Sequence, residues 1–201
     1  LINAVFHSSS GGRTENSGQV WKYQLPYLKS VNDYDQNSTK YRWTKKFTSS
    51  ELNNIFPDLG GLNSIQVIDK SNTDRVLKLR LHGSNVNRNI SGKDLRKKLQ
   101  LLSTKFEVYL KFNQRDLDSK SNKLISNNDK RKFNLDNKTY DVLEPQPLPL
   151  IPKDYFLLVK GYGAGHGVGM SQWGAKSMAE NGASFHKILK HYYTGVQIKS
   201  Y

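Results

Sequence analysis

The chain contains 201 residues, and its 31 Lys and Arg against 17 Asp and Glu give a formal charge of +14. With a mean hydropathy of −0.70, it has no apolar run near the roughly 18 residues that a membrane span needs. The lack of cysteine excludes disulfides, thiolate catalysis and Cys-ligated zinc. The charge favours a polyanionic partner, which would be nucleic acid, an acidic lipid surface or the bacterial wall. Because no helix-turn-helix, zinc-finger or RNA-recognition motif accompanies it, we expect no nucleic acid partner.

The chain begins at Leu1, inside the apolar stretch of residues 1–6, and has no signal-peptide pattern. We therefore expect it to be part of a longer polypeptide, with any membrane anchor lying upstream. The absence of cysteine is also compatible with a bacterial protein that works outside the cytoplasm.

The first two thirds of the chain predict short helices and alternating strands. Residues 50–56 predict a helix that ends at Pro57. Residues 64–69 and 75–82 predict two strands around a polar turn, with apolar and basic residues alternating in the second strand. Ser91 is a candidate N-cap for a helix that runs to about Leu102. Residues 106–112 alternate again and predict a half-buried strand.

The remaining third combines polar, proline-rich and glycine-rich segments. Residues 113–138 are almost wholly polar and predict an exposed loop or a hairpin insertion, and residues 144–153 contain four prolines and predict an extended connector. Residues 155–159 predict a buried strand. Two helices follow, one capped by Ser171 and ending at Gly182, the other capped by Ser184 with an apolar side. The expected fold class is α+β, with mixed or antiparallel strands, a few short helices that form a cleft, and a C-terminal helix pair after the glycine-rich loop.

Five glycines alternate between residues 161 and 169, between a predicted strand and a helix N-terminus. This order is typical of a nucleotide-binding loop. The dinucleotide fingerprint fails in every register because its third glycine falls on His166, Val168 or Met170, and the P-loop fails because Ala175 stands where its lysine must be. Neither kind of nucleotide site is therefore predicted.

Two interpretations of the glycine segment remain open. Alternating glycines in an extended strip let a bulky ligand approach the backbone, with His166 as the functional side chain and Ser171 and Gln172 adding a hydroxyl and an amide. The segment can equally be a tight packing seam in which His166 bonds only to backbone. No metal or other cofactor is expected, because His186 and His191 lie roughly 140° apart around a helix and HExxH is absent.

Several segments together resemble one known family. Besides the string GHGVGMSQ at residues 165–172, the matches include FHSSSGG at 6–12, PYLKSV at 26–31, ISG at 90–92 and HYYTGV at 191–196. In these motifs the chain resembles the C-terminal portion of the SpoIID/LytB family of bacterial wall enzymes. The resemblance implies a SpoIID-like domain over residues 1–201. It also implies a lytic transglycosylase acting on glycan strands of peptidoglycan that lack stem peptides, during engulfment in spore formers.

The catalytic acid is the main departure from that family. The resemblance implies that the general acid is a glutamate upstream of Leu1, so no catalytic residue is assigned within this chain. Cleavage of a glycosidic bond needs a carboxylic acid to protonate the leaving oxygen. Glu15 is the carboxylate nearest to the family-matching polar residues, and we expect it to be a surface or hydrogen-bonding group rather than a replacement acid.

The remaining site residues are expected to bind substrate. His166, Gln172 and Ser171 lead this set. The resemblance adds the hydroxyls of Ser8, Ser9, Ser10 and Thr14, the ring of Tyr27 as a stacking platform, and Lys29 as a contact for carboxylates or acetamido oxygens. A Ser/Gly turn and an amphipathic edge strand are the structural alternatives. Trp21 and Trp173 are also stacking candidates, although large aromatic side chains are more typical of a core.

Two functions from different classes stay open. The first is the substrate cleft of a lytic transglycosylase, working in the cell wall or at the outer face of the membrane, which during sporulation is the space between mother cell and forespore. The second is a non-catalytic wall-binding module or amidase modifier, with other cell-wall hydrolases as partners. Peptidoglycan glycan strands are the expected ligand in both.

Overall fold

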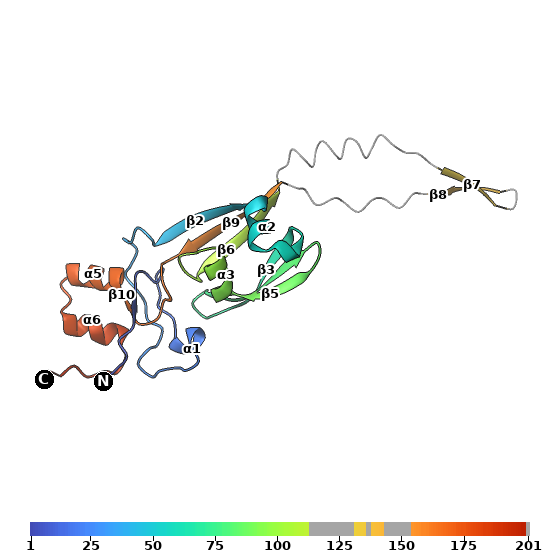
Figure 1. Ribbon diagram of the computed structural model, residues 1–201. Coiled ribbons are helices and arrows are strands. Elements are labelled where there is room, and N and C mark those ends of the chain that lie inside the picture. Colours follow the sequence, from blue (N-terminus) through green and yellow to red (C-terminus); the bar gives the residue numbers. More distant parts are fainter. Residues whose placement is uncertain (113–130, 136–137, 143–153, 200–201) are drawn as a thin grey trace.

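Two three-stranded antiparallel sheets form the larger part of the molecule (Figure 1). The structure is a computed structural model and describes residues 1–112, 131–135, 138–142 and 154–199. In the first sheet β9 (Tyr155–Tyr162) lies between β2 (Arg42–Thr48) and β6 (Phe106–Phe112). In the second sheet β4 (Val76–Gly83) lies between β3 (Leu62–Lys70) and β5 (Asn87–Ser91). The strands predicted at 64–69, 75–82, 106–112 and 155–159 are confirmed.

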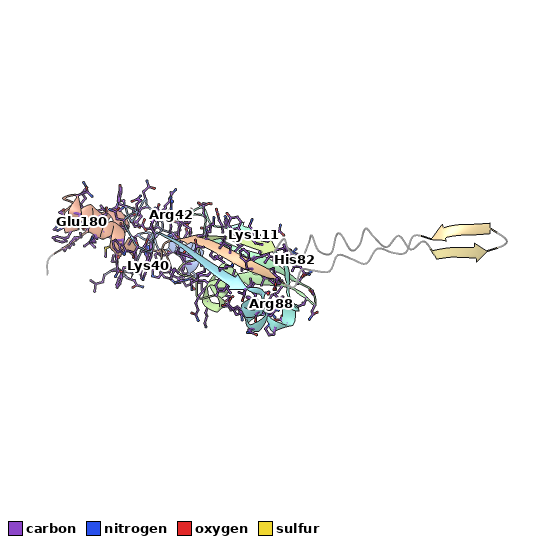
Figure 2. The ribbon with its side chains drawn as sticks, turned by 90° about the horizontal axis from the view of Figure 1, so that it is seen from above. Lys40, Arg42, His82, Arg88, Lys111 and Glu180 are labelled. Carbon is purple, nitrogen blue, oxygen red and sulfur yellow. The ribbon has the colours of Figure 1, made fainter. Side chains whose placement is uncertain are left out.

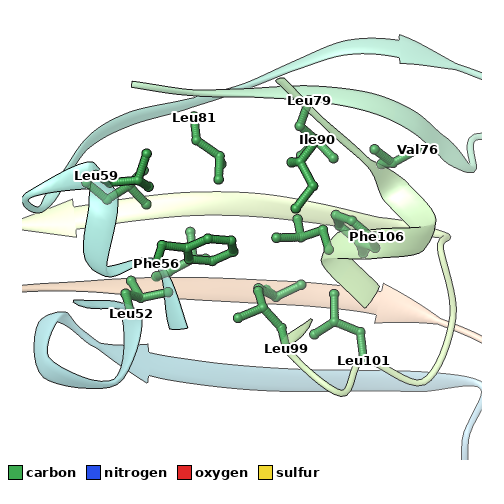
Figure 3. Packing of buried hydrophobic residues seen from close by; sticks show 14 of the residues in the cluster. Leu52, Phe56, Leu59, Val76, Leu79, Leu81, Ile90, Leu99, Leu101 and Phe106 are labelled. Atoms are coloured by element: carbon green, nitrogen blue, oxygen red, sulfur yellow. The ribbon is translucent and has the colours of Figure 1, made fainter. Parts of the chain in front are cut away.

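The main hydrophobic core lies between these two sheets (Figure 3). Apolar side chains of β4 and β5 meet those of β6 and β9, and α2 (Ser49–Ile55) and the 3-10 turn η1 (Pro57–Leu59) contribute from one end. Leu79 and Val159 are 0% exposed, and Leu81 and Leu157 are 1% exposed. The alternation read from the sequence of β4 and β6 therefore marks the side that faces this core.

Helix boundaries follow local capping chemistry. Thr48 caps α2 in a reciprocal capping box with Glu51. Ser91 caps α3 (Gly92–Lys98), as predicted, by accepting a hydrogen bond from the backbone of Asp94. The predicted end of α3 near Leu102 is wrong, because the chain turns at Gln100, whose φ of 51° lies in the left-handed region.

A smaller part packs around a short parallel ladder and a helix pair. β1 (Phe6–His7) pairs in parallel with β10 (Met170–Ser171), and α1 (Ser17–Val20) follows in the N-terminal segment. The predicted helices are α5 (Gln172–Glu180), capped by Ser171, and α6 (Phe185–Tyr192), capped by Ser184. They enclose a second cluster of buried residues: Leu28, Val168, Ile188, Tyr192 and Tyr193.

The structure also bears on the expected fold class, on the position of Phe185 and on the polar segment of residues 113–138. The α+β class is confirmed. The spacing of Phe185, Ile188 and Tyr192 predicts that all three lie on the apolar side of α6, but Phe185 is 62% exposed. Strands β7 (Arg131–Leu135) and β8 (Lys138–Val142) pair antiparallel at the end of the polar segment 113–138, whereas 113–130 and the connector 144–153 lie outside the described residues. Among the residues that the structure describes, no helix combines the length and hydropathy of a membrane span.

Replacement of Leu79 tests this core. Because its side chain is fully buried between the sheets, we expect Leu79→Ala to lower the free energy of unfolding by about 2–5 kcal/mol. Lys78→Ala, one residue earlier on the exposed side of β4, is the control, and we expect it to change that free energy by less than about 0.5 kcal/mol. Urea unfolding followed by circular dichroism measures both, and equal losses would contradict the placement of the core.

Candidate functional site

Two loops that are far apart in sequence lie against each other beside the β1–β10 ladder. The backbone of Ser9 exchanges hydrogen bonds with Ala164 at N–O distances of 3.1 and 2.7 Å. The N–H of Glu15 donates to the carbonyl of Gly167 at 2.7 Å. The Ser/Gly loop of residues 8–12 and the glycine-rich loop of residues 161–169 therefore form one continuous backbone surface.

The glycine-rich loop is not the extended strip that the alternation suggested. Gly163 and Gly167 have φ values of 70° and 82°, in the left-handed region that favours glycine. A Cβ atom at Gly163 would collide with the backbone of Ser9 and Ser10, and one at Gly167 would collide with the guanidinium of Arg75. The bare backbone thus accommodates other segments of the same chain. Of the two interpretations left open by the sequence, the structure favours a packing seam for these glycines.

The Ser/Gly loop is held by two buried aspartates. The Ser9 hydroxyl donates to Asp35 at 2.5 Å and the Ser10 hydroxyl donates to Asp33 at 2.6 Å. The next two backbone N–H groups also donate to Asp35, each at 2.8 Å. Asp33 further accepts from the hydroxyl of Tyr192 in α6, at 2.6 Å. Both carboxylates are therefore compensated by hydrogen bonds inside the fold. This compensation is needed because an unpaired buried charge is costly.

Glu15 is 0% exposed and its two oxygens are already engaged. One oxygen accepts from the hydroxyls of Ser71 and Thr73, and the other accepts from the backbone N–H of Asn16 at 2.8 Å. The expectation of a hydrogen-bonding rather than catalytic group fits this geometry, whereas the alternative of a surface position is wrong.

Arg75 lies next to this carboxylate and is only 2% exposed. Its Nη2 donates to the carbonyl of Ser10 at 2.8 Å, while Nε and Nη1 have no partner among the described residues. Burial lowers the pKa of Arg75 to about 10, and the nearby charge of Glu15 opposes that shift. Arg75 remains charged at neutral pH and links β4 to the Ser/Gly loop.

Two histidines lie side by side above this buried charge. His7 is 5% exposed, and its Nδ1 lies 3.1 Å from the carbonyl of Val168, so that nitrogen carries the hydrogen. Its Nε2 has no partner among the described residues. Burial, with further contributions from Arg75 and His166, lowers the pKa of His7 to about 3. The ring is therefore neutral at physiological pH.

His166 is half-buried and forms part of an aromatic wall. Its ring centroid lies 5.5 Å from that of His7 and 5.2 Å from that of Trp21. Its Nδ1 accepts from the backbone N–H of Val168 at 3.1 Å, so Nε2 carries the hydrogen of the neutral ring. Burial lowers the pKa of His166, which favours that neutral form.

These groups surround a pocket of about 300 Å³, which we call the His166 pocket. It has an aromatic wall, a floor from the start of β4 and a rim of cations and hydroxyls. Its lining consists of Glu15, Gln19, Val20, Trp21, Arg75, Val76, Leu77, Ser91, Lys93, Arg96, Thr104 and His166. Glu15 is the one carboxylate in this lining. A mainly apolar wall with a few convergent polar groups is typical of a small-ligand site.

The structure separates the residues that the sequence grouped as substrate-binding. Of that group, only His166 lines the His166 pocket. Gln172 is exposed at the start of α5 and lies outside that lining. Tyr27 and Lys29 line a different groove of about 920 Å³ beside the chain termini and α6, where the Tyr27 hydroxyl accepts from the backbone of Asn3 at 3.0 Å.

The predicted hydroxyls have internal roles instead. Thr14 and Ser171 are both 0% exposed; the first hydrogen-bonds to the backbone of Val31 and the second caps α5. Ser9 and Ser10 are used by the two aspartates, and half-buried Ser8 accepts from the backbone N–H of Trp173 through its carbonyl. The Ser/Gly turn, which the sequence left as an alternative, therefore describes this loop.

Sequence reasoning missed the charged residues on which the site depends. Asp33 and Asp35 lie in a polar stretch, and Arg75 begins a strand, so all three look solvent-exposed in the sequence. The one available signal was the spacing of the two aspartates, which points both to the same side of an extended segment. No comparable signal marks Arg75.

Comparison with known proteins identifies several relatives of this chain. No family model matches the chain. The chain is 32% identical over 200 residues to the stage II sporulation protein D of Bacillus subtilis (strain 168), an alignment that covers 98% of this chain and 45% of that protein. The protein of the same name from Bacillus amyloliquefaciens has the same identity and coverage. An amidase enhancer of Bacillus subtilis (strain 168) is 27% identical over 223 residues, covering 100% of this chain and 30% of that protein. The chain thus spans less than half the length of these relatives.

Two glycines with matching backbone angles test the packing seam. Gly167 and Gly182 have φ values of 82° and 80°, but a Cβ would meet Arg75 at the first and nothing within 4 Å at the second. We expect Gly182→Ala to cost about 1 kcal/mol from the backbone alone. Gly167→Ala should cost at least about 2 kcal/mol more, because a buried guanidinium must move. Equal costs in urea unfolding would contradict the packing role.

The buried His7 ring makes stability depend on pH. The unfolded chain binds a proton at His7 below its ordinary pKa of 6.5, whereas the folded chain does not until about pH 3. The free energy of unfolding should therefore fall as the pH drops, by about 2 kcal/mol between pH 7 and pH 5 from this group. We expect His7→Asn, which keeps a donor but cannot titrate, to lose that part of the decline. Identical pH profiles for both proteins would refute it.

Proposed function

The chain belongs to the SpoIID/LytB family, and from this premise we propose that it binds peptidoglycan glycan strands in the His166 pocket, as the substrate-binding part of a lytic transglycosylase. The observation that carries the proposal is the aromatic wall of Trp21 and His166 beside a polar and cationic rim. The relatives are named for sporulation and for enhancement of an amidase, which supports a role in the cell wall, outside the cytoplasm.

The lining suits a sugar in chemical terms. Trp21 and His166 offer flat rings against which the C–H face of a pyranose packs. Gln19 and Thr104 offer an amide and a hydroxyl, which both donate and accept hydrogen bonds as sugar hydroxyls and acetamido groups require, whereas the Ser91 hydroxyl already donates to Asp94 at 2.6 Å. Arg96 and Lys93 can pair with the carboxylate of a lactyl ether, the group that distinguishes muramic acid from glucosamine.

The proposed reaction breaks one glycosidic bond without water. A carboxylic acid protonates the leaving oxygen while the C1–O bond breaks. The 6-hydroxyl of the same muramic acid residue then attacks C1 and gives its proton to the resulting carboxylate, which regenerates the acid. The products are a 1,6-anhydro-muramic end and a new 4-hydroxyl end. Because both oxygens of Glu15 are engaged with internal donors, Glu15 is a positioning residue that fixes the loop under Trp21. The proposal assigns the general acid to a residue outside this chain, as the family resemblance implies.

The neutral imidazole of His166 contributes to orientation. Its ring is fixed by the hydrogen bond from Val168 and by contact with Trp21, so its plane is set before a ligand enters. Pre-organised groups lose little conformational entropy on binding, which favours a defined sugar position.

A non-catalytic wall-binding role is the second candidate. It is favoured by the engagement of Glu15 and by the similarity to a protein named amidase enhancer. Incubation of the chain with denuded glycan strands separates the two: strand lengths that stay constant during binding support a binding module, and 1,6-anhydro ends that appear with this chain alone refute the external general acid.

Trp21 provides the direct test of the pocket. Because its ring forms the wall that a sugar would contact, we expect Trp21→Ala and His166→Ala each to weaken binding to denuded glycan strands about tenfold. Tyr23→Ala, which removes a 65% exposed ring two residues away and outside the pocket, should change affinity less than about twofold. Isothermal titration measures all three. Wild-type affinity in Trp21→Ala, or an equal loss in Tyr23→Ala, would contradict the proposal.

A further inference from the structure

One side of the β2–β9–β6 sheet faces away from the core and forms what we call the outer sheet face. The register places alternate residues of the three strands there, while the intervening residues, such as Trp43, Val108 and Val159, pack into the core. The outer sheet face consists of Arg42, Thr44, Lys46 and Thr48 from β2, Phe156, Leu158, Lys160 and Tyr162 from β9, and Glu107, Tyr109 and Lys111 from β6.

This face is open to solvent. The cations and threonines on it are exposed, Tyr109 is 39% exposed, and the rings of Phe156 and Tyr162 are half-buried. In the view from above, no helix is drawn across the middle of β2 and β9, and Arg42 and Lys111 are labelled along this part of the molecule (Figure 2). An antiparallel sheet with one solvated side normally carries scattered polar residues there, whereas this one carries ordered pairs.

Each aromatic ring on the outer sheet face is paired with a cation. The pairs are Lys46 with Phe156 at 4.1 Å, Lys160 with Tyr109 at 5.6 Å, and Arg42 with Tyr162 at 5.9 Å from the ring centroid. Cation–π contacts fix long side chains that would otherwise sample many rotamers. The positive charges are therefore held in place before a ligand arrives.

The fixed cations form a regular row. Lys160 lies opposite Thr44, which separates Arg42 from Lys46 on the neighbouring strand. With steps of about 7 Å for two residues along a strand and about 5 Å between strands, the Cα atoms of successive cationic residues stand about 8 Å apart. Glu107 is the one carboxylate on this face, and it already accepts a hydrogen bond from Tyr109 at 2.5 Å.

A pocket of mixed charge adjoins the outer sheet face at the Tyr162 end. It has a volume of about 390 Å³, and its lining includes Tyr41, Lys70 and Lys105 together with the carboxylates of Asp74 and Glu107. The ring of Tyr41 meets that of Tyr162 edge-on at 6.3 Å. None of the residues that line this pocket lines the His166 pocket, so the two surfaces are separate.

We propose that the outer sheet face is a second binding surface, and that it binds a phosphodiester-linked polyol polymer of the cell wall. Such a polymer carries a negative charge at each repeat and no flat base, which matches a spaced row of cations. Single-stranded nucleic acid requires bare aromatic rings for its bases, and here cations lie over the rings. A membrane would require protruding apolar side chains, and here two of the three rings are half-buried. This surface would keep the chain on the wall independently of the glycan site.

Poly(glycerol phosphate) is the probe for this proposal. The triple variant Arg42→Gln, Lys46→Gln, Lys160→Gln removes the row, and Lys78→Gln, Lys187→Gln, Lys190→Gln removes the same charge from exposed positions elsewhere. We expect the first to weaken binding at least about tenfold and to reduce the slope of log K against log salt by about 2, and the second to change affinity less than about threefold. Matching circular dichroism melts, and the single variant Lys160→Gln, guard against a folding effect.

Several results would overturn the proposal. Equal losses in the two triple variants would assign binding to net charge alone, and no binding by the wild-type chain would remove the surface altogether. Tighter binding to oligodeoxythymidylate of equal phosphate number, or to phosphatidylglycerol vesicles, with dependence on the same three residues, would assign the face to nucleic acid or to a membrane. Trp21→Ala should bind poly(glycerol phosphate) like wild type, so failure of the glycan proposal and failure of this one are distinguishable.

Discussion

The buried guanidinium of Arg75 imposes the strongest constraint on this structure. A charge that is 2% exposed must be compensated inside the protein, and the compensation comes from an N-terminal segment that is distant in sequence from β4. The carbonyl of Ser10 accepts one of its hydrogen bonds, and the carboxylate of Glu15 provides the nearby negative charge. Gly167 lies against the guanidinium because no larger residue fits there. One side chain thereby fixes the Ser/Gly loop, the turn before β4 and the glycine-rich loop together.

The His166 pocket is a consequence of that arrangement. Arg75 contributes to its floor. The segment after Glu15 forms α1, and Trp21, which follows this helix, contributes its ring to the wall. His166 contributes to the same wall from the glycine-rich loop. The ring of His7 packs against that of His166, and its burial keeps the His7 ring neutral. The pocket is therefore assembled from three segments that buried polar contacts hold together.

Much of the fold could be predicted from the sequence, because its signals are local. The alternation in β4 and β6 and the capping residues Ser91, Ser171 and Ser184 are readable from short windows. The site could be predicted only in part. The alternating glycines mark the segment as distinctive, but glycine serves both a ligand strip and a packing seam, so the sequence does not distinguish the two. Asp33, Asp35 and Arg75 look like surface residues, since their burial depends on partners that approach from more than 20 residues away.

Nuclear magnetic resonance during titration with denuded glycan strands shows whether the His166 pocket holds the sugar. The indole N–H of Trp21 and the ring resonances of His166 report on the pocket wall, while the backbone amides of Tyr27 and Lys29 report on the separate groove beside the termini. We expect saturable shifts at Trp21 and His166 with little change at Tyr27 and Lys29. Shifts confined to Tyr27 and Lys29, with Trp21 and His166 unmoved at saturation, would contradict this expectation.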